Sequence, residues 1–404
     1  MLVALLAVEF CDELASGVLP ASTPEVQAAF GLTAGLAAGL ILVGFQALSV
    51  FVEPLLLLRA SRGPRRPFLL AGLFGMAACC LLGAASTGWA VLLLSVLLYG
   101  PASGLGVHLA QAALMDERAG ERERAMARWC LWGLLGDAAA FALLPVLAWA
   151  GLGWRSAMLV CAAAWVLLSS AFHRAPVHEA ASAPDEAKPS LRQALGEALR
   201  NRRLLAWTVG GLLCALLDEI VVAFGALHLS TRLGLGPGAR SLAFGALLAG
   251  QIVGVALVER LLVTIRPLDL LRVSTAMGAV AYVAWVYAPG LASCAVLAFV
   301  VGALAAPSYP IVEAQAYASL PGRSGTVAAV GSLLGPFQAA LPLALAWVAD
   351  GAGLTAAMLA LVMQPVGVFA ISSLVGPRKV AWWPVNHHRG SANDVRAVSS
   401  PQRH

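Results

Sequence analysis

Twelve apolar runs, each about as long as the roughly 20 residues that a membrane-spanning helix needs, limit what this chain can fold into. Only 12% of the residues are charged and 60% are hydrophobic, whereas soluble proteins carry about 25% charged residues. The composition therefore predicts an all-α polytopic membrane protein. The predicted spans form two sets of six: 2–28, 34–58, 67–86, 88–115, 125–150 and 154–172, then 204–230, 239–262, 267–288, 290–318, 325–349 and 353–375.

Lysine and arginine mark one side of the predicted membrane domain. They gather between spans two and three, between spans four and five, in the stretch 173–203 and after the last span, whereas the opposite side carries only Arg155, Arg232 and Arg240. Because cytoplasmic loops are enriched in Lys and Arg, we expect both termini in the cytoplasm and the protein in the inner (cytoplasmic) membrane. The expected domains are a six-helix bundle over 1–172, a cytoplasmic linker over 173–203 with a short amphipathic helix from Ser190 to Arg200, a second bundle over 204–376 and a disordered tail over 377–404.

Several other classes of protein are excluded by motifs that the sequence lacks. All seven cysteines lie in apolar segments, so no disulfide framework is predicted. No glycine-rich segment is followed by Lys-Ser or Lys-Thr, which excludes direct use of ATP. Gly136-Asp137 lacks the rest of an intramembrane aspartyl protease motif, and His178-Glu179 lacks the second histidine of a zinc protease. We therefore expect no enzyme, no cofactor and no nucleic-acid partner.

The first span carries three carboxylates, on Glu9, Asp12 and Glu13. At helical spacing they fall on one arc of roughly 100° and can share one inward-facing side. An ionised group at the bilayer centre costs roughly 2.5–3.5 kcal/mol even on translocon-derived scales, so we expect a transport or coupling role for at least one of them. The alternative for Glu9, about two turns from the chain start, is that it reaches the cytoplasmic surface.

A shift of 206 positions superposes the first two spans of each set. It brings Asp12-Glu13 onto Asp218-Glu219, Gly39 onto Gly245, Gly44 onto Gly250 and Val52-Glu53 onto Val258-Glu259. Apolar matches mean little in so hydrophobic a chain, but acidic pairs that repeat at one shift are hard to obtain by chance. The sequence therefore predicts an internal duplication of two six-helix units with the same orientation, as in a parallel-repeat secondary transporter.

With this repeat, the chain resembles the major facilitator superfamily (MFS) over residues 1–376. The resemblance implies twelve helices in two pseudo-symmetric bundles that rock about a solute site near the bilayer midplane, lined by spans one, four, seven and ten. Carried onto this chain, it implies a cavity lined by Asp12, Glu13, His108, Gln111, Asp218, Glu219, Tyr309, Glu313 and Gln315, with Glu9 on the same lining.

Two motifs of that family are altered here. The family's loop Gly-x-x-x-Asp-Arg-x-Gly-Arg-Arg between spans two and three corresponds to Arg59-Ala60-Ser61-Arg62-Gly63-Pro64-Arg65-Arg66, which keeps the basic cluster and lacks the acidic residue. We expect Glu53, one or two turns upstream, to take over a gating salt bridge with Arg62 or Arg65, and Glu259 to be its copy in the second half. The drug-antiporter signature built around Gly-Pro is replaced by Gly133-Leu134-Leu135-Gly136-Asp137.

Other polar groups also lie inside the predicted spans. Asp137 is either a proton carrier or a structural acceptor for a neighbouring helix. His108 and Gln111 share one face of span four, and histidine suits proton relay near neutral pH, although a structural hydrogen-bonding role is the commoner one. Glu313 follows Tyr309 by one turn on the same face, and two nearby prolines free backbone carbonyls that can line a cavity.

The sequence thus predicts a monomeric secondary transporter that works by alternating access, coupled to protons through buried carboxylates of the set Asp12, Glu13, Asp218, Glu219, Asp137 and Glu313. The acidic excess around the expected cavity favours a cationic or neutral solute. Two alternatives remain open. One is a divalent metal transporter that uses these carboxylates with Cys11 and Cys214, and the other is a non-transporting assembly or sensor protein on the same fold.

Overall fold

The computed structural model describes the chain except for residues 33–40, 42, 62–63, 175–190, 218 and 376–404. Predictions for Arg62, Asp218, most of the linker and the tail 377–404 therefore fall outside the described residues, as does the side chain of Glu219. The described elements are helices: α1 (Leu2–Ala21), α2 (Thr23–Phe30), α4 (Ser49–Ala60), α5 (Arg65–Ala84), α6 (Trp89–Glu117), α7 (Arg122–Trp149), α8 (Trp154–Arg174), α9 (Leu191–Arg200), α10 (Arg202–Cys214), η1 (Ala215–Leu217), α11 (Glu219–Leu233), α12 (Pro237–Leu261), α13 (Pro267–Val286), α14 (Leu291–Ala305), α15 (Ser308–Ser319), α16 (Ser324–Ser332), α17 (Gly335–Ala352), α18 (Leu354–Ala360) and α19 (Met363–Leu374).

Nine helical stretches of the described residues are long and apolar enough to cross a membrane, judged by length and composition alone. Helix α1 is not among them, and its three carboxylates give the physical reason. The second predicted span includes residues outside the described part of the chain. The number of twelve spans therefore stays a prediction.

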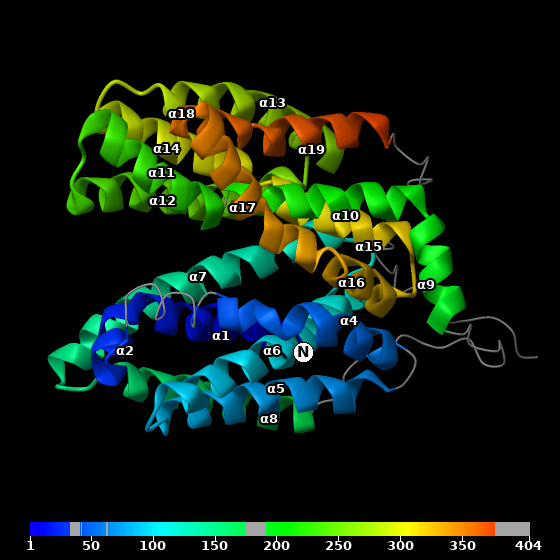
Figure 1. The fold of residues 1–404 in the computed structure, drawn as a ribbon. Helices are drawn as coiled ribbons and strands as arrows, with labels where there is room; N and C mark the ends of the chain where they lie inside the picture. The colour runs from blue at the N-terminus through cyan, green and yellow to red at the C-terminus, as the bar shows by residue number, and fades with distance from the viewer. Residues whose placement is uncertain (33–40, 42, 62–63, 175–190, 218, 376–404) are drawn as a thin grey trace, which may run out of the picture.

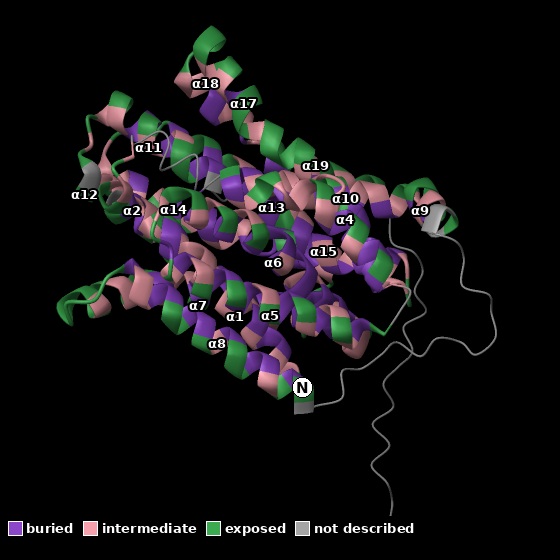
Figure 2. Cartoon of the chain, turned by 60° about the horizontal axis from the view of Figure 1, so that its bottom comes forward, coloured by how far each residue is buried: buried purple, intermediate pink, exposed green. Residues whose placement is uncertain are grey.

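The helices form two bundles that lie one above the other in Figure 1. Helices α1 to α8 make the first bundle, which is the lower one in this view, and α10 to α19 make the second bundle above it. Helix α9 lies at one end beside them. Exposed residues face outward and buried residues face inward within each bundle (Figure 2). Large apolar side chains such as Leu167, Val280 and Trp347 are among the most exposed, which is the surface that a lipid environment requires.

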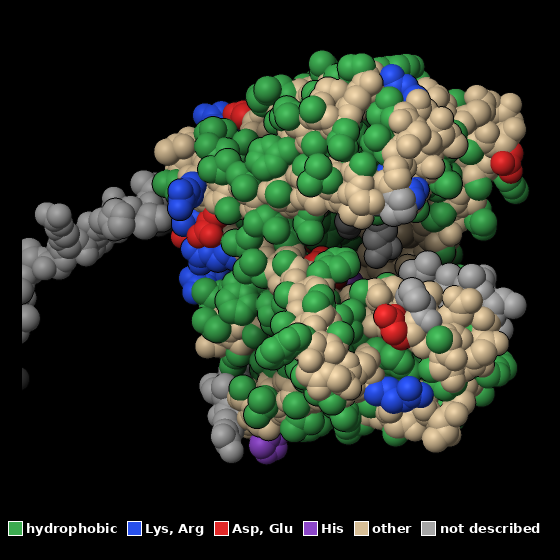
Figure 3. Space-filling view, turned by 90° about the vertical axis from the view of Figure 1, so that its left-hand side faces the viewer, with side chains coloured by type: hydrophobic (Ala, Val, Ile, Leu, Met, Phe, Trp, Pro, Cys, Tyr) green, Lys and Arg blue, Asp and Glu red, His purple; other side chains and the backbone are tan. Residues whose placement is uncertain are grey.

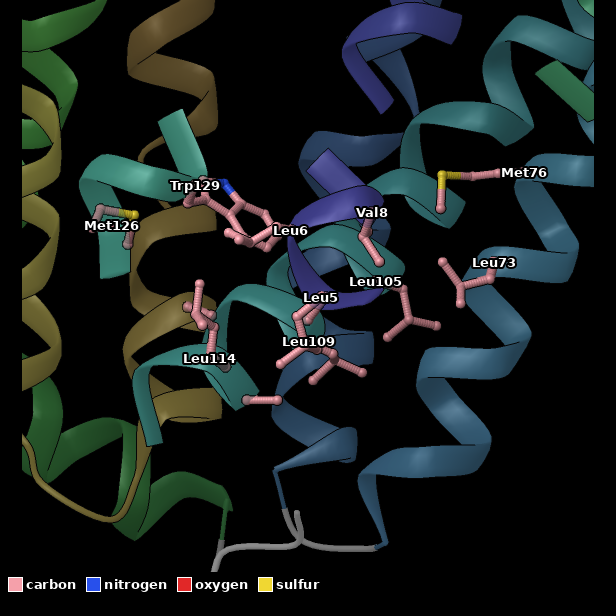
Figure 4. Packing of buried hydrophobic residues seen from close by; sticks show 14 of the residues in the cluster. Leu5, Leu6, Val8, Leu73, Met76, Leu105, Leu109, Leu114, Met126 and Trp129 are labelled. Atoms are coloured by element: carbon pink, nitrogen blue, oxygen red, sulfur yellow. The ribbon is translucent and has the colours of Figure 1, made fainter. Parts of the chain in front are cut away.

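Close side-chain packing holds the first bundle together. Leu5 and Val8 of α1 meet Leu105 and Leu109 of α6, next to Met76 of α5 (Figure 4). All five are almost completely buried. Because lipid tails are as apolar as leucine, such contacts stabilise a membrane bundle by dispersion and fit more than by exclusion of water.

Matching glycine contacts relate the two bundles to each other. A Cβ atom added to Gly100 of α6 would lie 2.0 Å from the Phe45 carbonyl oxygen, and one added to Gly302 of α14 would lie 2.1 Å from the Leu247 carbonyl oxygen. Only glycine permits helices to approach this closely. Both residues of the second contact follow those of the first by 202 positions. The contacts of Gly44 with Leu93 and of Gly250 with Phe299 are related by 206 instead, so the glycine contacts fit both shifts, which differ by about one helical turn.

Glu53 and Glu259, which the sequence repeat pairs, stand at different distances from the ends of their helices. Glu53 lies well inside α4, which ends at Ala60, whereas Glu259 lies in the last turn of α12, which ends at Leu261.

Helices of the second bundle are interrupted where α1, α6 and α7 of the first bundle are each continuous. Breaks separate α10 from α11, α14 from α15, and α16 from α17. At the first break the backbone N–H of Leu217 donates to Oε1 of Gln364, 2.7 Å away on α19. At the second break stands Pro307, which has no N–H to continue the helical ladder. Interrupted backbone inside a membrane is tolerated where protein groups or water satisfy it.

Candidate functional site: a cavity between the bundles

A cavity of about 570 Å³ lies between the two bundles. Figure 3, which views the molecule from the left-hand side of Figure 1, shows a hollow between the two halves at this end. We call the end of the molecule that carries this hollow the open end. The opposite end, where α4 ends and α16 begins, is the closed end. The volume of the cavity is in the range of known small-molecule sites. The polar side chains on its lining are those of Glu9, Glu13, His108, Asp137, Thr208, Gln251, Tyr309, Glu313, Gln338 and Gln364.

The wall from the first bundle is acidic. Glu9 and Glu13 of α1 and Asp137 of α7 all line the cavity. Two glycines of α7 let α1 come this close: a Cβ atom on Gly136 would lie 2.4 Å from the Phe10 carbonyl oxygen, and one on Gly133 would lie 3.1 Å from Oε1 of Glu9. The Gly-x-x-Gly-Asp sequence thus serves helix packing and brings three carboxyl groups to one wall.

The wall from the second bundle carries Glu313 and most of the amides. Glu313 and Tyr309 lie on α15, just beyond the break at Pro307, and both line the cavity. Residues at the three breaks, including Ala215, Ala306 and Leu334, line it as well. The interrupted helices therefore bring backbone as well as side chains to the cavity.

Asp12 and Glu13 take different directions from α1. The carboxylate of Asp12 accepts hydrogen bonds from Ser103 Oγ at 2.9 Å and from Tyr99 Oη at 3.1 Å, both on α6. It is not part of the cavity lining, whereas Glu13 is. Adjacent helical residues point about 100° apart, so only one of such a pair can face the cavity directly. In this structure that residue is Glu13.

His108 connects the cavity with a buried carboxylate. Its ring lines the cavity, and its Nδ1 is 3.1 Å from Oε1 of Glu53 and 2.9 Å from the Gly104 carbonyl oxygen. Glu53 also accepts hydrogen bonds from Ser49 at 2.7 Å and from Ser332 of the other bundle at 2.6 Å. In this structure Glu53 therefore pairs with His108, whereas the expected partner Arg65 pairs with Asp116.

Comparison with known proteins agrees with this architecture. The family model described as the Major Facilitator Superfamily matches residues 5–341. The chain belongs to the major facilitator superfamily. It is accordingly a multi-pass membrane protein and a secondary transporter rather than an enzyme. No curated protein sequence matches the chain.

Solved structures show the same fold at low sequence identity. A variant of the E. coli fucose:proton symporter FucP has a TM-score of 0.76 at 13% identity, with 93% of this chain and 98% of that chain covered. FucP in the outward conformation has a TM-score of 0.75 at 15% identity, with 93% and 99% covered. The human organic anion transporter MFSD10 (TETRAN) has a TM-score of 0.68 at 21% identity, with 92% and 96% covered.

An ion pair joins the bundles of this MFS protein at the closed end. Arg128 of α7 binds Glu259 of α12 through two nitrogens, the Nε at 2.7 Å, and Arg124 lies 3.9 Å from the same carboxylate. The side chains of Arg128 and Glu259 are 32% and 28% exposed. This pair lies where water reaches it.

Two side-chain hydrogen bonds between the bundles lie at the same end. Gln111 accepts from Tyr317 Oη at 2.9 Å, and Gln315 donates to Glu123 at 2.9 Å. The expected cavity residues Gln111 and Gln315 therefore belong to the closed end in this structure and not to the cavity lining. They lie on the expected helices, and their depth along those helices accounts for the difference.

Arg65 forms its ion pair with Asp116. The Oδ2 of Asp116 accepts from Arg65 of α5 and, at 2.6 Å, from Ser324 Oγ of α16. Arg65 stands at the first residue of α5, whereas Glu53 lies well inside α4. The acidic partner of the basic loop is thus at the end of α6, a position that the sequence pattern did not single out.

Only one of the two cysteines considered for a metal site lies on the cavity. Cys214 lines the cavity, and Cys11 does not. Among the described residues, no group of three or more His, Cys, Asp or Glu side chains has a geometry that could hold a metal ion. Asp218 and the side chain of Glu219 are outside that search.

Proposed function

We propose that this protein is a proton-coupled transporter of a small cationic or neutral solute that works by alternating access. The observation that carries the proposal is a cavity lined by four carboxyl groups, on Glu9, Glu13, Asp137 and Glu313, between two bundles that are joined at one end. In this proposal, protonation of these groups changes the free energy of one conformation relative to the other. Asp12, Asp218 and Glu219, the other carboxylates of the sequence repeat, take part in the same coupling.

The direction of the molecule in the membrane is part of the proposal. Arg65, Arg122, Arg128 and Arg323 belong to the closed end, whereas Arg155, Arg232 and Arg240 belong to helix ends of the opposite side. Because basic residues favour the cytoplasmic side, the closed end faces the cytoplasm and the cavity opens outward. The fold likeness to FucP in the outward conformation supports this orientation.

The charges on the cavity lining indicate which kind of solute the protein prefers. His108 is the only basic side chain on the cavity lining of the described residues, against four carboxyl groups. A cation that enters such a site compensates charges that are costly to keep unpaired away from water. An anion would meet repulsion from both walls.

The test is solute-driven proton movement in proteoliposomes that contain the purified protein, screened over organic cations, sugars, amino acids and divalent metal ions. We expect flux with an organic cation or neutral solute, and we expect Glu313→Gln and Asp137→Asn to abolish it. Asp350→Asn, which changes an exposed acid on α17, is the matched control and should transport normally.

Other outcomes of that screen favour the two alternatives. Flux with divalent metal ions alone, lost in Cys214→Ser, would favour a metal transporter. Binding and flux absent for every class would favour a non-transporting protein on this fold. Equal flux in Glu313→Gln and wild type would refute the coupling role of that carboxylate. We expect the unit of transport to be the monomer.

A further inference from the structure

His108 belongs to two parts of the molecule at once. Its side chain is 37% exposed and lines the cavity, so solute and water can reach the ring. Its Nδ1 faces two acceptors, the Gly104 carbonyl oxygen and Oε1 of Glu53. Nδ1 must therefore carry a hydrogen and donate it, which leaves Nε2 as the ring atom able to exchange a proton with the cavity.

Glu53 connects His108 to the other bundle. Its side chain is only 12% exposed, and Oε1, which faces His108, also accepts the 2.6 Å hydrogen bond from Ser332 of α16. Gly104 makes room for this carboxylate: a Cβ atom there would lie 2.2 Å from Oε2 of Glu53. One buried carboxylate thus links a cavity residue to a hydrogen bond that joins the bundles.

The charges around His108 decide the sign of the effect. The carboxyl groups that interact electrostatically with the ring are Glu53 of α4, Asp12 of α1 and Glu313 of α15. All three favour the charged ring. A buried carboxylate without its cation is strongly unfavourable, whereas a hydrated one is not, so loss of the ring's charge favours a conformation in which water reaches Glu53.

We propose that His108 is the positioning residue that couples the cavity to the closed end. While the ring is charged, it holds Glu53 ionised and in place for Ser332, and the closed end stays shut. When the ring loses its proton to the cavity, as pH rises or as a cation approaches Glu313, the closed end opens. The inference rests on the proposed function, because it treats the cavity as the solute path.

The closed end can be followed without any solute. Ser61 of the first bundle packs against Gly325 of the second, since a Cβ atom on Gly325 would lie 3.0 Å from Ser61 Cβ. The alkylation rate of Ser61→Cys in the full-length protein in nanodiscs, located by mass spectrometry, reports opening. Ala119→Cys, an exposed position between α6 and α7, corrects for the effect of pH on thiol reactivity.

We expect the corrected rate to rise about tenfold or more between about pH 6 and about pH 10.5 in a wild-type background, since this range is wide enough to include loss of the charge of a histidine that faces carboxylates, and a buried unpaired carboxylate is costly. His108→Asn, which keeps a donor near the Nδ1 position and cannot become charged, should react fast at both pH values. His108→Lys, which stays charged, should react slowly at both. Adding Glu53→Gln to His108→Asn removes the unpaired charge and should restore slow alkylation.

These variants separate coupling from a merely structural role. If His108 only fills space, His108→Asn and His108→Lys would shift the rate in the same direction, and Glu53→Gln would not rescue the first. A wild-type rate that does not change with pH, or an unchanged pH response in His108→Asn, would overturn the proposal. Absence of proton-coupled flux together with the expected alkylation pattern would instead refute the proposed function and leave this coupling intact.

Discussion

Glu53 and Glu259 look like copies of one another in the sequence, and the structure gives them different surroundings. Glu53 is 12% exposed and contacts a histidine and two serines, whereas Glu259 is 28% exposed and contacts two arginines. The difference follows from their places in the helices, because Glu259 lies in the last turn of α12, whereas Glu53 lies well inside α4.

The two carboxylates thus make two kinds of contact at the closed end. At the edge, Glu259 and Arg128 form an ion pair that water reaches. Further from the helix end, Glu53 and His108 form a pair whose charge depends on protonation of the ring and that touches the cavity. The comparison suggests that the outer pair holds the bundles together and that the inner pair senses the cavity.

The largest effect should come from taking away the room that Glu53 occupies. Gly104→Ala places a Cβ atom 2.2 Å from Oε2 of Glu53 and forces the buried carboxylate out of its contacts. We expect a loss of about 3 kcal/mol or more of stability, seen as a lower thermal unfolding midpoint in detergent, since breaking a buried pair costs this much. Gly278→Ala, whose added Cβ would be an ordinary 3.6 Å from Leu304, is the control and should not destabilise. Equal midpoints for both variants would contradict the packing argument.

A smaller effect should follow from cutting only the hydrogen bond between the bundles. Ser332→Ala removes the donor to Glu53 and leaves His108 in place. We expect the closed end to open about tenfold more often, because a hydrogen bond to a charged group contributes about 1.5–3 kcal/mol. Ser61→Cys alkylation measures it. Ser373→Ala, which loses a bond only to its own helix, is the control and should leave the rate unchanged.

The side of a helix on which a residue lies was predictable from the sequence, but its position along the helix relative to the cavity was not. The apolar runs and the repeat indicated the family, and helical spacing showed that only one of Asp12 and Glu13 can face the cavity. The choice between them depends on Tyr99 and Ser103 of α6, which no local pattern brings next to α1.

The same limit explains the residues that the sequence placed elsewhere. Gln111 and Gln315 lie on the expected helices but at the closed end, where Tyr317 and Glu123 bind them. Which end is closed is a property of the conformation and has no signature in residue spacing. His108 was a candidate from the start, but its pairing with Glu53 needs the close approach that Gly104 permits, and only packing reveals that.

The smallest effect should distinguish the two gate contacts by their response to salt. The side chains of Arg128 and Glu259 are about a third exposed, so their attraction is screened as the Debye length falls from about 10 Å at 0.1 M to about 3 Å at 1 M salt. Glu259→Gln should therefore open the closed end by an amount that corresponds to about 1 kcal/mol at low salt and much less at high salt. The Ser332→Ala effect should persist at high salt, because Glu53 is shielded from ions in solution. Equal salt responses of the two variants would mean that both contacts are equally open to water, and the distinction between an outer ion pair and an inner sensing pair would fail.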